Sequence, residues 1–184
     1  MKPGNIWKHY KTITRHRRLV RKGCFKVGLI WQGLTHDLSK YSAAEFWVGA
    51  KYFQGNRSPN NAEREDRGYS SAWLHHKGRN KHHYEYWIDY NSHTGGDGED
   101  VMVPVPMPDK YIAEMIMDRI AASKVYRGTD YVDSDPRDYY WQGTQRAPLH
   151  DYTRETLLKY LNMLADEGEE KTFKAIKREL VKKK

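Results

Sequence analysis

The chain has 184 residues, a net charge of +8 and 38% hydrophobic residues, which is enough for one domain, residues 1–184, with a buried core. Its single cysteine, Cys24, excludes an internal disulfide framework. No apolar stretch approaches the roughly 20 residues that a membrane span needs. We therefore expect a soluble, cytoplasmic protein without a membrane partner.

The positive charge is concentrated in the N-terminal segment. No acidic residue precedes Asp37, whereas nine basic residues do: Lys2, Lys8, Lys11, Arg15, Arg17, Arg18, Arg21, Lys22 and Lys26. Such a segment is suited to a phosphate-bearing ligand or to nucleic acid, through charge attraction and counterion release. A solvated helix face explains the same charges, and both interpretations stay open at this point.

The first two predicted helices cover 5–21 and 23–33. In the first, residues at alternating steps of three and four share one face: Ile6, His9, Ile13, His16 and Val20. Two histidines therefore lie in an otherwise apolar stripe. The second helix is expected to end near Gly33, just before the pair His36-Asp37.

A third helix is predicted over about 43–53. Ser42 has the residue type of an N-cap, and Glu45 stands at the N3 position of a capping box. A fourth helix is predicted over about 60–76, although Gly68 weakens its middle.

The run from His75 to His83 is interrupted by Gly78 and Asn80. We expect His75 and His76 to end one helix, and His82 and His83 to open the next. The first turn of that next helix would expose backbone N–H groups, which favour an anion. The following segment, 92–108, is rich in glycine and then in proline, and it predicts a long loop: a lid, a partner contact or a flexible insertion.

The last predicted helices cover 109–126, 153–165 and 169–181, with a break near Gly168. Asp118 projects from the apolar stripe of the first of these, and a buried carboxylate is costly unless it is paired or bound to metal. Strand patterns are nearly absent. We therefore predict an all-α fold, with a core over about 5–127 and a C-terminal helical extension over about 142–184.

Metal binding is the chemistry that the histidines suggest. The runs 35–40 and 75–83 hold five of the nine histidines and the carboxylate of Asp37, and they contain no cysteine. Imidazole and carboxylate together bind transition metals. With His16 and Asp118 they would converge from different helices on one or two ions, Mn or Fe first, with Mg, Co, Ni or Zn as alternatives. A helix-capping turn is the structural alternative for Asp37.

The order His16, His36-Asp37, His75-His76, Asp118 resembles the metal-binding pattern of the HD-domain superfamily of metal-dependent phosphohydrolases. The run 36–40 is similar to that family's His-Asp-x-(Gly/Ser)-Lys motif, and 113–118 resembles the helix that carries its last Asp. The resemblance spans roughly 10–127 and implies a compact helical bundle. The segments 36–40, 55–59 and 73–87 together resemble more closely an uncharacterised family of small bacterial and phage proteins.

This resemblance implies a phosphohydrolase that acts on a nucleotide or other phosphorylated small molecule. The metal ligands would be His16, His36, Asp37, Asp118 and at least one of His75 and His76. The metal would lower the pKa of a water molecule toward neutrality. Lys40, Arg57, Lys77 and Arg79 are candidates for binding phosphate. His82 and His83 would bind a second metal, protonate the leaving oxygen or contact phosphate, and exposure at the surface without such a role is the alternative for both.

Two other functions fit the same residues. Some HD-type proteins use a di-iron pair to oxidise small molecules with O₂, and the extra histidines permit this. Alternatively, the chain is a small basic helical protein that binds nucleic acid through 2–26 and is not an enzyme. That last hypothesis requires neither the paired histidines nor Asp118 in an apolar stripe.

Overall fold

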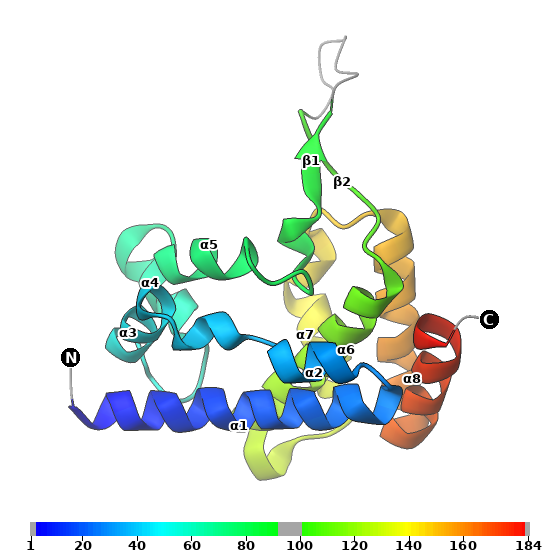
Figure 1. The fold of residues 1–184 in the computed structure, drawn as a ribbon, viewed down its shortest axis with the longest axis horizontal. Coiled ribbons are helices and arrows are strands. Elements are labelled where there is room, and N and C mark those ends of the chain that lie inside the picture. Colours follow the sequence, from blue (N-terminus) through cyan, green and yellow to red (C-terminus); the bar gives the residue numbers. More distant parts are fainter. Residues whose placement is uncertain (1–2, 92–100, 183–184) are drawn as a thin grey trace.

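The computed structural model describes residues 3–91 and 101–182, which form an all-α fold with one small hairpin (Figure 1). The α-helices are α1 (Pro3–Val27), α2 (Ile30–Thr35), α3 (Ala43–Lys51), α4 (Pro59–Arg67), α5 (Ser71–Lys77), α6 (Asp109–Arg127), α7 (Asp135–Gln142) and α8 (Asp151–Ile176). Short 3-10 turns occupy Leu38–Tyr41, Tyr84–Tyr86, Gly128–Asp130 and Thr144–Arg146, and a π-helical turn occupies Lys177–Val181. Strands β1 (Ile88–Tyr90) and β2 (Met102–Pro104) pair antiparallel. The predicted all-α class is confirmed.

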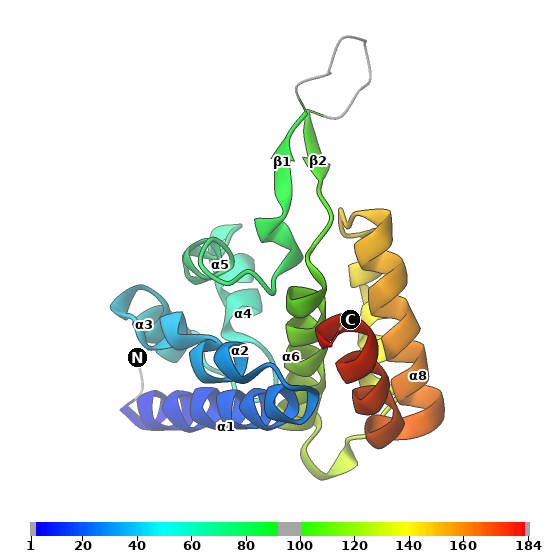
Figure 2. The same cartoon turned by 45° about the vertical axis from the view of Figure 1, so that its right-hand side comes forward.

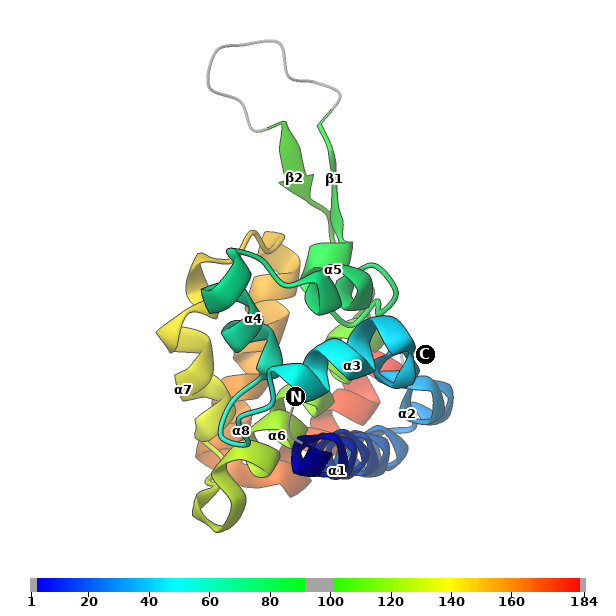
Figure 3. The same ribbon diagram turned by 90° about the vertical axis from the view of Figure 1, so that its left-hand side faces the viewer.

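Helices α1 and α6 form the centre of the fold. In Figure 2, α6 runs across α1, and α8 lies on the far side of α6. Helices α3, α4 and α5 gather on the other side, above the N-terminal half of α1, while the hairpin projects away from the helices (Figure 3). One hydrophobic cluster joins α1, α6 and α8, and it includes Val20, Cys24, Ile112, Ile116, Leu157 and Leu161. The C-terminal helices therefore share a core with α1 and α6. In the described ranges, no helix is long and apolar enough to cross a membrane.

Two predicted helix boundaries were wrong, and both errors involve glycine. The first helix continues through 22 to Val27 and breaks at Gly28, whose φ of 92° favours glycine. The helix predicted over 60–76 is two helices, because Gly68 has a φ of 79° and ends α4. The break predicted near Gly168 is confirmed, with φ 81° and ψ 172° inside α8.

Other local predictions need correction too. Ser42 is the N-cap of α3 by position, but its side chain makes no capping bond. His83 precedes only a short 3-10 turn rather than a new helix. Within the loop predicted over 92–108, residues 92–100 lie outside the described residues, and Met102–Pro104 is a strand. Helix α7 was not predicted at all.

The basic N-terminal segment lies on α1, where several of its charges have partners inside the fold. Arg17 donates to the carbonyls of His36 and Leu34, over 2.7 and 3.2 Å. Arg15 donates to the carbonyl of Lys124, and the Lys26 ammonium lies over the ring of Phe173. These contacts give part of the charge a structural role. Nucleic-acid binding by the remainder stays a prediction.

His9 makes folding sensitive to acid. Burial, and secondarily the Lys40 charge, lower the pKa of His9 to about 4, and the side chain packs on Phe46 and Phe53. The folded state therefore holds His9 neutral, so its contribution to stability is present above pH 6.5 and is lost as the pH falls toward 4. Between pH 7.5 and pH 5 we expect this residue to cost about 2 kcal/mol. Urea unfolding at both values should show a smaller loss in His9→Leu than in the wild type, and equal losses would contradict the prediction.

Candidate metal centre

The centre is built around Asp37, which directly follows the turn at the end of α2. Asp37 has φ 53° and ψ 28°, and among the described residues it is the only non-glycine with a positive φ. Aspartate tolerates this left-handed conformation better than most residues, and such backbone strain concentrates at functional sites. Arg17 holds the turn through the carbonyl of His36. The Asp37 residue is fully buried.

The first group of potential ligands contains His16, His36, Asp37 and Asp118. Asp118 Oδ1 lies 2.9 Å from His16 Nε2 and 3.4 Å from His36 Nε2. Asp37 Oδ2 lies 3.3 Å from His36 Nε2 and 3.7 Å from His16 Nε2. One donor atom from each of the four residues lies within 4.8 Å of the others. Helices α1 and α6 and the turn after α2 each contribute to this group.

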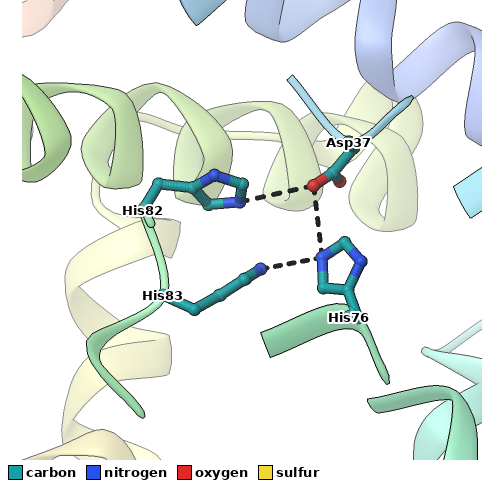
Figure 4. Close-up of side chains that lie close together, drawn as sticks. All are labelled: Asp37, His76, His82 and His83. Atoms are coloured by element: carbon teal, nitrogen blue, oxygen red, sulfur yellow. Dashed lines mark hydrogen bonds and ion pairs between the residues drawn. The ribbon is translucent and has the colours of Figure 1, made fainter. Parts of the chain in front are cut away.

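The second group contains Asp37, His76, His82 and His83 (Figure 4). Asp37 Oδ1 lies 3.2 Å from His76 Nε2 and 3.4 Å from His82 Nε2. His83 Nε2 lies 2.9 Å from His76 Nε2. Both groups thus share Asp37, which presents Oδ2 to the first and Oδ1 to the second. If ions were bound, Asp37 would supply one oxygen to each group.

Several buried polar atoms of the centre make no hydrogen bond, although Lys40 Nζ forms an ion pair with Asp37 Oδ2. Five buried atoms make no hydrogen bond of acceptable geometry: Nε2 of His16, His36 and His82, and both carboxylate oxygens of Asp37. Buried polar groups in folded proteins are nearly always satisfied. Here the unsatisfied atoms converge, and imidazole nitrogen with carboxylate oxygen is a donor set for transition metals. The residues present therefore fit one or two metal ions.

Two glutamates orient the imidazoles through contacts to their Nδ1 atoms. Glu114 Oε1 lies 2.9 Å from His36 Nδ1 and 3.1 Å from His82 Nδ1. Glu45 accepts from Nδ1 of His75 and of His76, each over 2.7 Å. A proton held on Nδ1 leaves the lone pair on Nε2, which is the atom that faces the centre. These two glutamates were missed as site residues by the sequence reasoning, which placed Glu45 in a capping box. Glu114 lies one helical turn before Asp118, and this spacing was the available signal.

Replacing Glu114 with glutamine should weaken metal binding without removing a donor atom. The neutral amide oxygen is a weaker hydrogen-bond acceptor than the carboxylate oxygen, so it holds the Nδ1 protons of His36 and His82 less firmly. We expect metal affinity to fall by about 10- to 100-fold, which is the usual effect of losing a residue that hydrogen-bonds to a metal ligand. Equilibrium dialysis against Mn²⁺ measures it. Glu65→Gln, a change to an exposed glutamate paired with Arg57, is the matched control; equal affinity in all three proteins would refute the orienting role.

The charges of the centre stabilise one another. Burial opposes ionisation of Asp37, but His36, Lys40 and His76 hold its pKa well below the usual range. Burial likewise opposes ionisation of Asp118, and His16 and His36 hold its pKa well below the usual range. Burial lowers the pKa of His16, and of His83 strongly, so these two imidazoles stay neutral. Burial opposes protonation of His36 and His76, but Asp37 and the other carboxylates raise the pKa of both imidazoles. Metal ligands require ionised carboxylates and neutral imidazoles, so His36 and His76 would each release a proton when a metal binds.

The structure brings together most of the residues that the sequence singled out as ligands. His75 is the exception: its Nδ1 binds Glu45, and it belongs to neither group. The sequence predicted at least one of His75 and His76 as a ligand. His76 is the one that faces Asp37. His82 and His83, expected as ligands, acids or phosphate contacts, lie in the second group.

The four predicted phosphate contacts differ in position. Lys40 Nζ lies 2.5 Å from Asp37 Oδ2 with 30% of its side chain exposed, so it can reach a ligand at the centre. Arg57 is held by both oxygens of Glu65 and by Gln54. Because these bonds occupy its guanidinium, nothing here supports a phosphate contact by Arg57. Lys77 and Arg79 lie at the end of α5 and just beyond it, where Arg79 donates to the carbonyl of His75.

Comparison with known proteins places the chain in a family without naming an activity. No curated protein and no solved structure matches it. A family model does match residues 5–163, a range that includes every residue of both ligand groups. The resemblance to the HD-domain superfamily stays a prediction. By that match, the chain belongs to a family of unknown function, DUF5662.

Proposed function

We propose that the protein is a metal-dependent phosphohydrolase, distantly related to the HD-domain superfamily, that hydrolyses a phosphate ester. One observation carries the proposal: two groups of histidine and carboxylate donors share Asp37, and five of their buried donor atoms make no hydrogen bond. The order of these residues along the chain supports the relationship to HD domains. A buried donor set of this kind is hard to explain by packing alone, because unsatisfied polar groups destabilise a fold.

The residues in and around the ligand groups would have different roles in the reaction. Divalent cations, when bound, lower the pKa of a water molecule and offset charge on phosphoryl oxygens. Lys40 adds a positive charge at the edge of the centre, where it can attract the phosphate. His82 is buried, and its two nitrogens face Asp37 and Glu114, which suits a ligand. His83 is only partly buried, and because burial and the neighbouring His82 keep its imidazole neutral, it is better suited to contact the phosphate than to protonate the leaving oxygen.

The histidine content favours transition metals over Mg²⁺. Five imidazoles and two carboxylates make up the two groups. Mn and Fe accept such mixed ligands, whereas Mg²⁺ prefers oxygen donors and keeps several waters. We therefore propose Mn or Fe as the resident ion, with two sites per chain.

The experiment that tests the function is a substrate screen on metal-loaded protein. Protein purified without chelator is analysed for its elements, then loaded separately with Mn²⁺, Fe²⁺, Co²⁺ and Mg²⁺. Release of inorganic phosphate is followed over nucleotides, sugar phosphates and aryl phosphates. Turnover that disappears on chelation and returns on reloading supports the proposal. Stoichiometric metal without turnover of any phosphate ester would overturn it.

A second candidate function shares the same ligands. A histidine-rich pair of sites bridged by one carboxylate also suits a di-iron oxygenase of a small molecule, and the five imidazoles favour this alternative. Iron at two atoms per chain, with an absorption change on exposure to O₂, would distinguish oxidation from hydrolysis.

A further inference from the structure

The outer side of α1 carries basic and aromatic side chains along one line. Five exposed residues occupy it: Trp7, Lys11, Arg18, Lys22 and Phe25. At 3.6 residues per turn they point within about 60° of one another, and Trp7 and Phe25 lie about 27 Å apart along the helix axis. The three basic residues stand between the two aromatic ones, and the Lys11 ammonium lies over the Trp7 ring. The outer side of α1 is thus basic in the middle and apolar at both ends.

Helix α2 enlarges the apolar end that contains Phe25. It runs back along α1 in the opposite direction (Figure 1), and Gly33 lies against the Phe25 ring, where a Cβ would come within 3.0 Å of Cδ1. With Gly33 facing α1, the helical spacing turns Ile30 and Leu34 toward the same side as Phe25. Ile30, Trp31 and Leu34 are 52%, 73% and 46% exposed, and α2 has no charged residue. Together with the line on α1, these three residues form the α1–α2 face, and contiguous exposed apolar side chains of this kind mark an interaction surface.

Several basic side chains of the α1–α2 face are free to meet a partner. Arg18, Lys22 and the neighbouring Arg21 are exposed and make no hydrogen bond, ion pair or ring contact with a described residue. Neither α1 nor α2 contains an acidic residue that could neutralise them. Such a surface attracts opposite charge, so the partner is anionic. His16 lies on the opposite side of α1, so the α1–α2 face is separate from the metal centre.

Of the anionic partners, a lipid bilayer fits the apolar residues best. Ile30 and Leu34 cannot stack on a nucleobase, and single-stranded nucleic acid is bound mainly through aromatic platforms. A second copy of the chain is disfavoured, because two-fold pairing would set one basic face against the other. A bilayer interface, by contrast, takes Trp, Phe and Leu at the boundary of the acyl chains and Lys and Arg at the anionic headgroups.

We propose that the α1–α2 face binds the surface of a membrane that contains anionic lipids. Phe25, Ile30 and Leu34 enter the boundary between headgroups and acyl chains, while Arg18 and Lys22 bind the charged headgroups. Such contact needs no spanning helix. The sequence predicted no membrane partner because no apolar stretch is long enough to span a bilayer, and the exposed apolar side of α2 becomes apparent only in the fold. This inference does not depend on the proposed reaction.

The test is co-sedimentation of the protein with vesicles of phosphatidylcholine, either alone or mixed with phosphatidylserine in equal parts. Binding should require phosphatidylserine and should weaken as salt is added, because salt screens the attraction. Arg18→Ala/Lys22→Ala should lower the affinity by about 25-fold, since each basic residue near an anionic surface contributes about fivefold. Lys171→Ala/Lys174→Ala removes the same charge from an exposed part of α8, and this matched control should keep the wild-type affinity.

Insertion of the apolar side chains has its own variant. Leu34→Ala should lower the affinity for the mixed vesicles by about tenfold, because less apolar area leaves water. Leu74→Ala on α5 is the matched control, since Leu74 is 54% exposed, and it should keep the wild-type affinity. Thermal unfolding of each variant checks that the fold is intact.

Other results would overturn the inference. Absence of binding to the mixed vesicles, or equal binding to both kinds, would exclude recognition of anionic lipid. Equal losses in Leu34→Ala and Leu74→Ala would exclude insertion of α2. Binding of a single-stranded oligonucleotide without binding of vesicles would assign the α1–α2 face to nucleic acid, and a dimer that Leu34→Ala dissociates and that binds no vesicles would assign it to a second copy. Because none of these measurements involves turnover, such results would leave the proposed function standing.

Discussion

Asp37→Asn is expected to lose metal from both groups at once and to abolish hydrolysis. Asp37 is the one residue that both groups share, and each of its oxygens serves one group. Asparagine keeps the left-handed backbone conformation at this position about as well as aspartate does, so the turn after α2 should persist. The change therefore removes the charge and one oxygen while leaving the backbone in place. Alanine at the same position would add backbone strain to the loss of the ligand.

The size of this effect separates a ligand from an orienting residue. A residue that hydrogen-bonds to a metal ligand typically contributes about 10- to 100-fold to metal affinity or activity. Loss of a ligand that both groups share should therefore lower activity by more than about 100-fold. Elemental analysis and phosphate release on the same preparations measure both quantities. Asp130→Asn, an exposed aspartate in a 3-10 turn, is the control and should keep both. Wild-type metal content in Asp37→Asn would show that the carboxylate is structural.

Removal of metal should lower the thermal stability of the protein by a large amount. Without a cation, the folded state keeps a cluster of ionised carboxylates and unsatisfied imidazoles in its interior. A ligand at a thousand times its dissociation constant stabilises the folded state by about 4 kcal/mol. For a chain of this size, about 2 to 4 °C corresponds to each kcal/mol, so chelation should lower Tm by about 8 to 16 °C.

Thermal unfolding followed by circular dichroism, with excess Mn²⁺ and then with chelator, measures this difference. The Asp37→Asn protein supplies the comparison, because it should melt at the same temperature under both conditions. If the wild type also melts at one temperature regardless of chelator, the two groups bind no ion in the folded protein. The close approach of the imidazoles to one another and to Asp37 would then have to be explained by protonation of some of the histidines, without a metal.

Local features of the chain were predictable because they depend on nearby residues. The helix over 109–126 followed from its apolar spacing, and the break at Gly168 followed from the residue type. The boundary at Gly28 was missed because a glycine does not by itself determine whether a helix continues. Helix α7 was missed because its sequence is polar and aromatic without a clear apolar stripe.

The sequence by itself determined the fold class and the set of residue types available for metal binding, because helix-forming periodicity and donor chemistry are properties of short segments. The tertiary structure decided which donors meet. His75 and His76 are adjacent in the chain, yet only His76 presents its Nε2 to Asp37, because consecutive residues on a helix point in different directions. Glu114 became part of the centre only when α6 packed against α1.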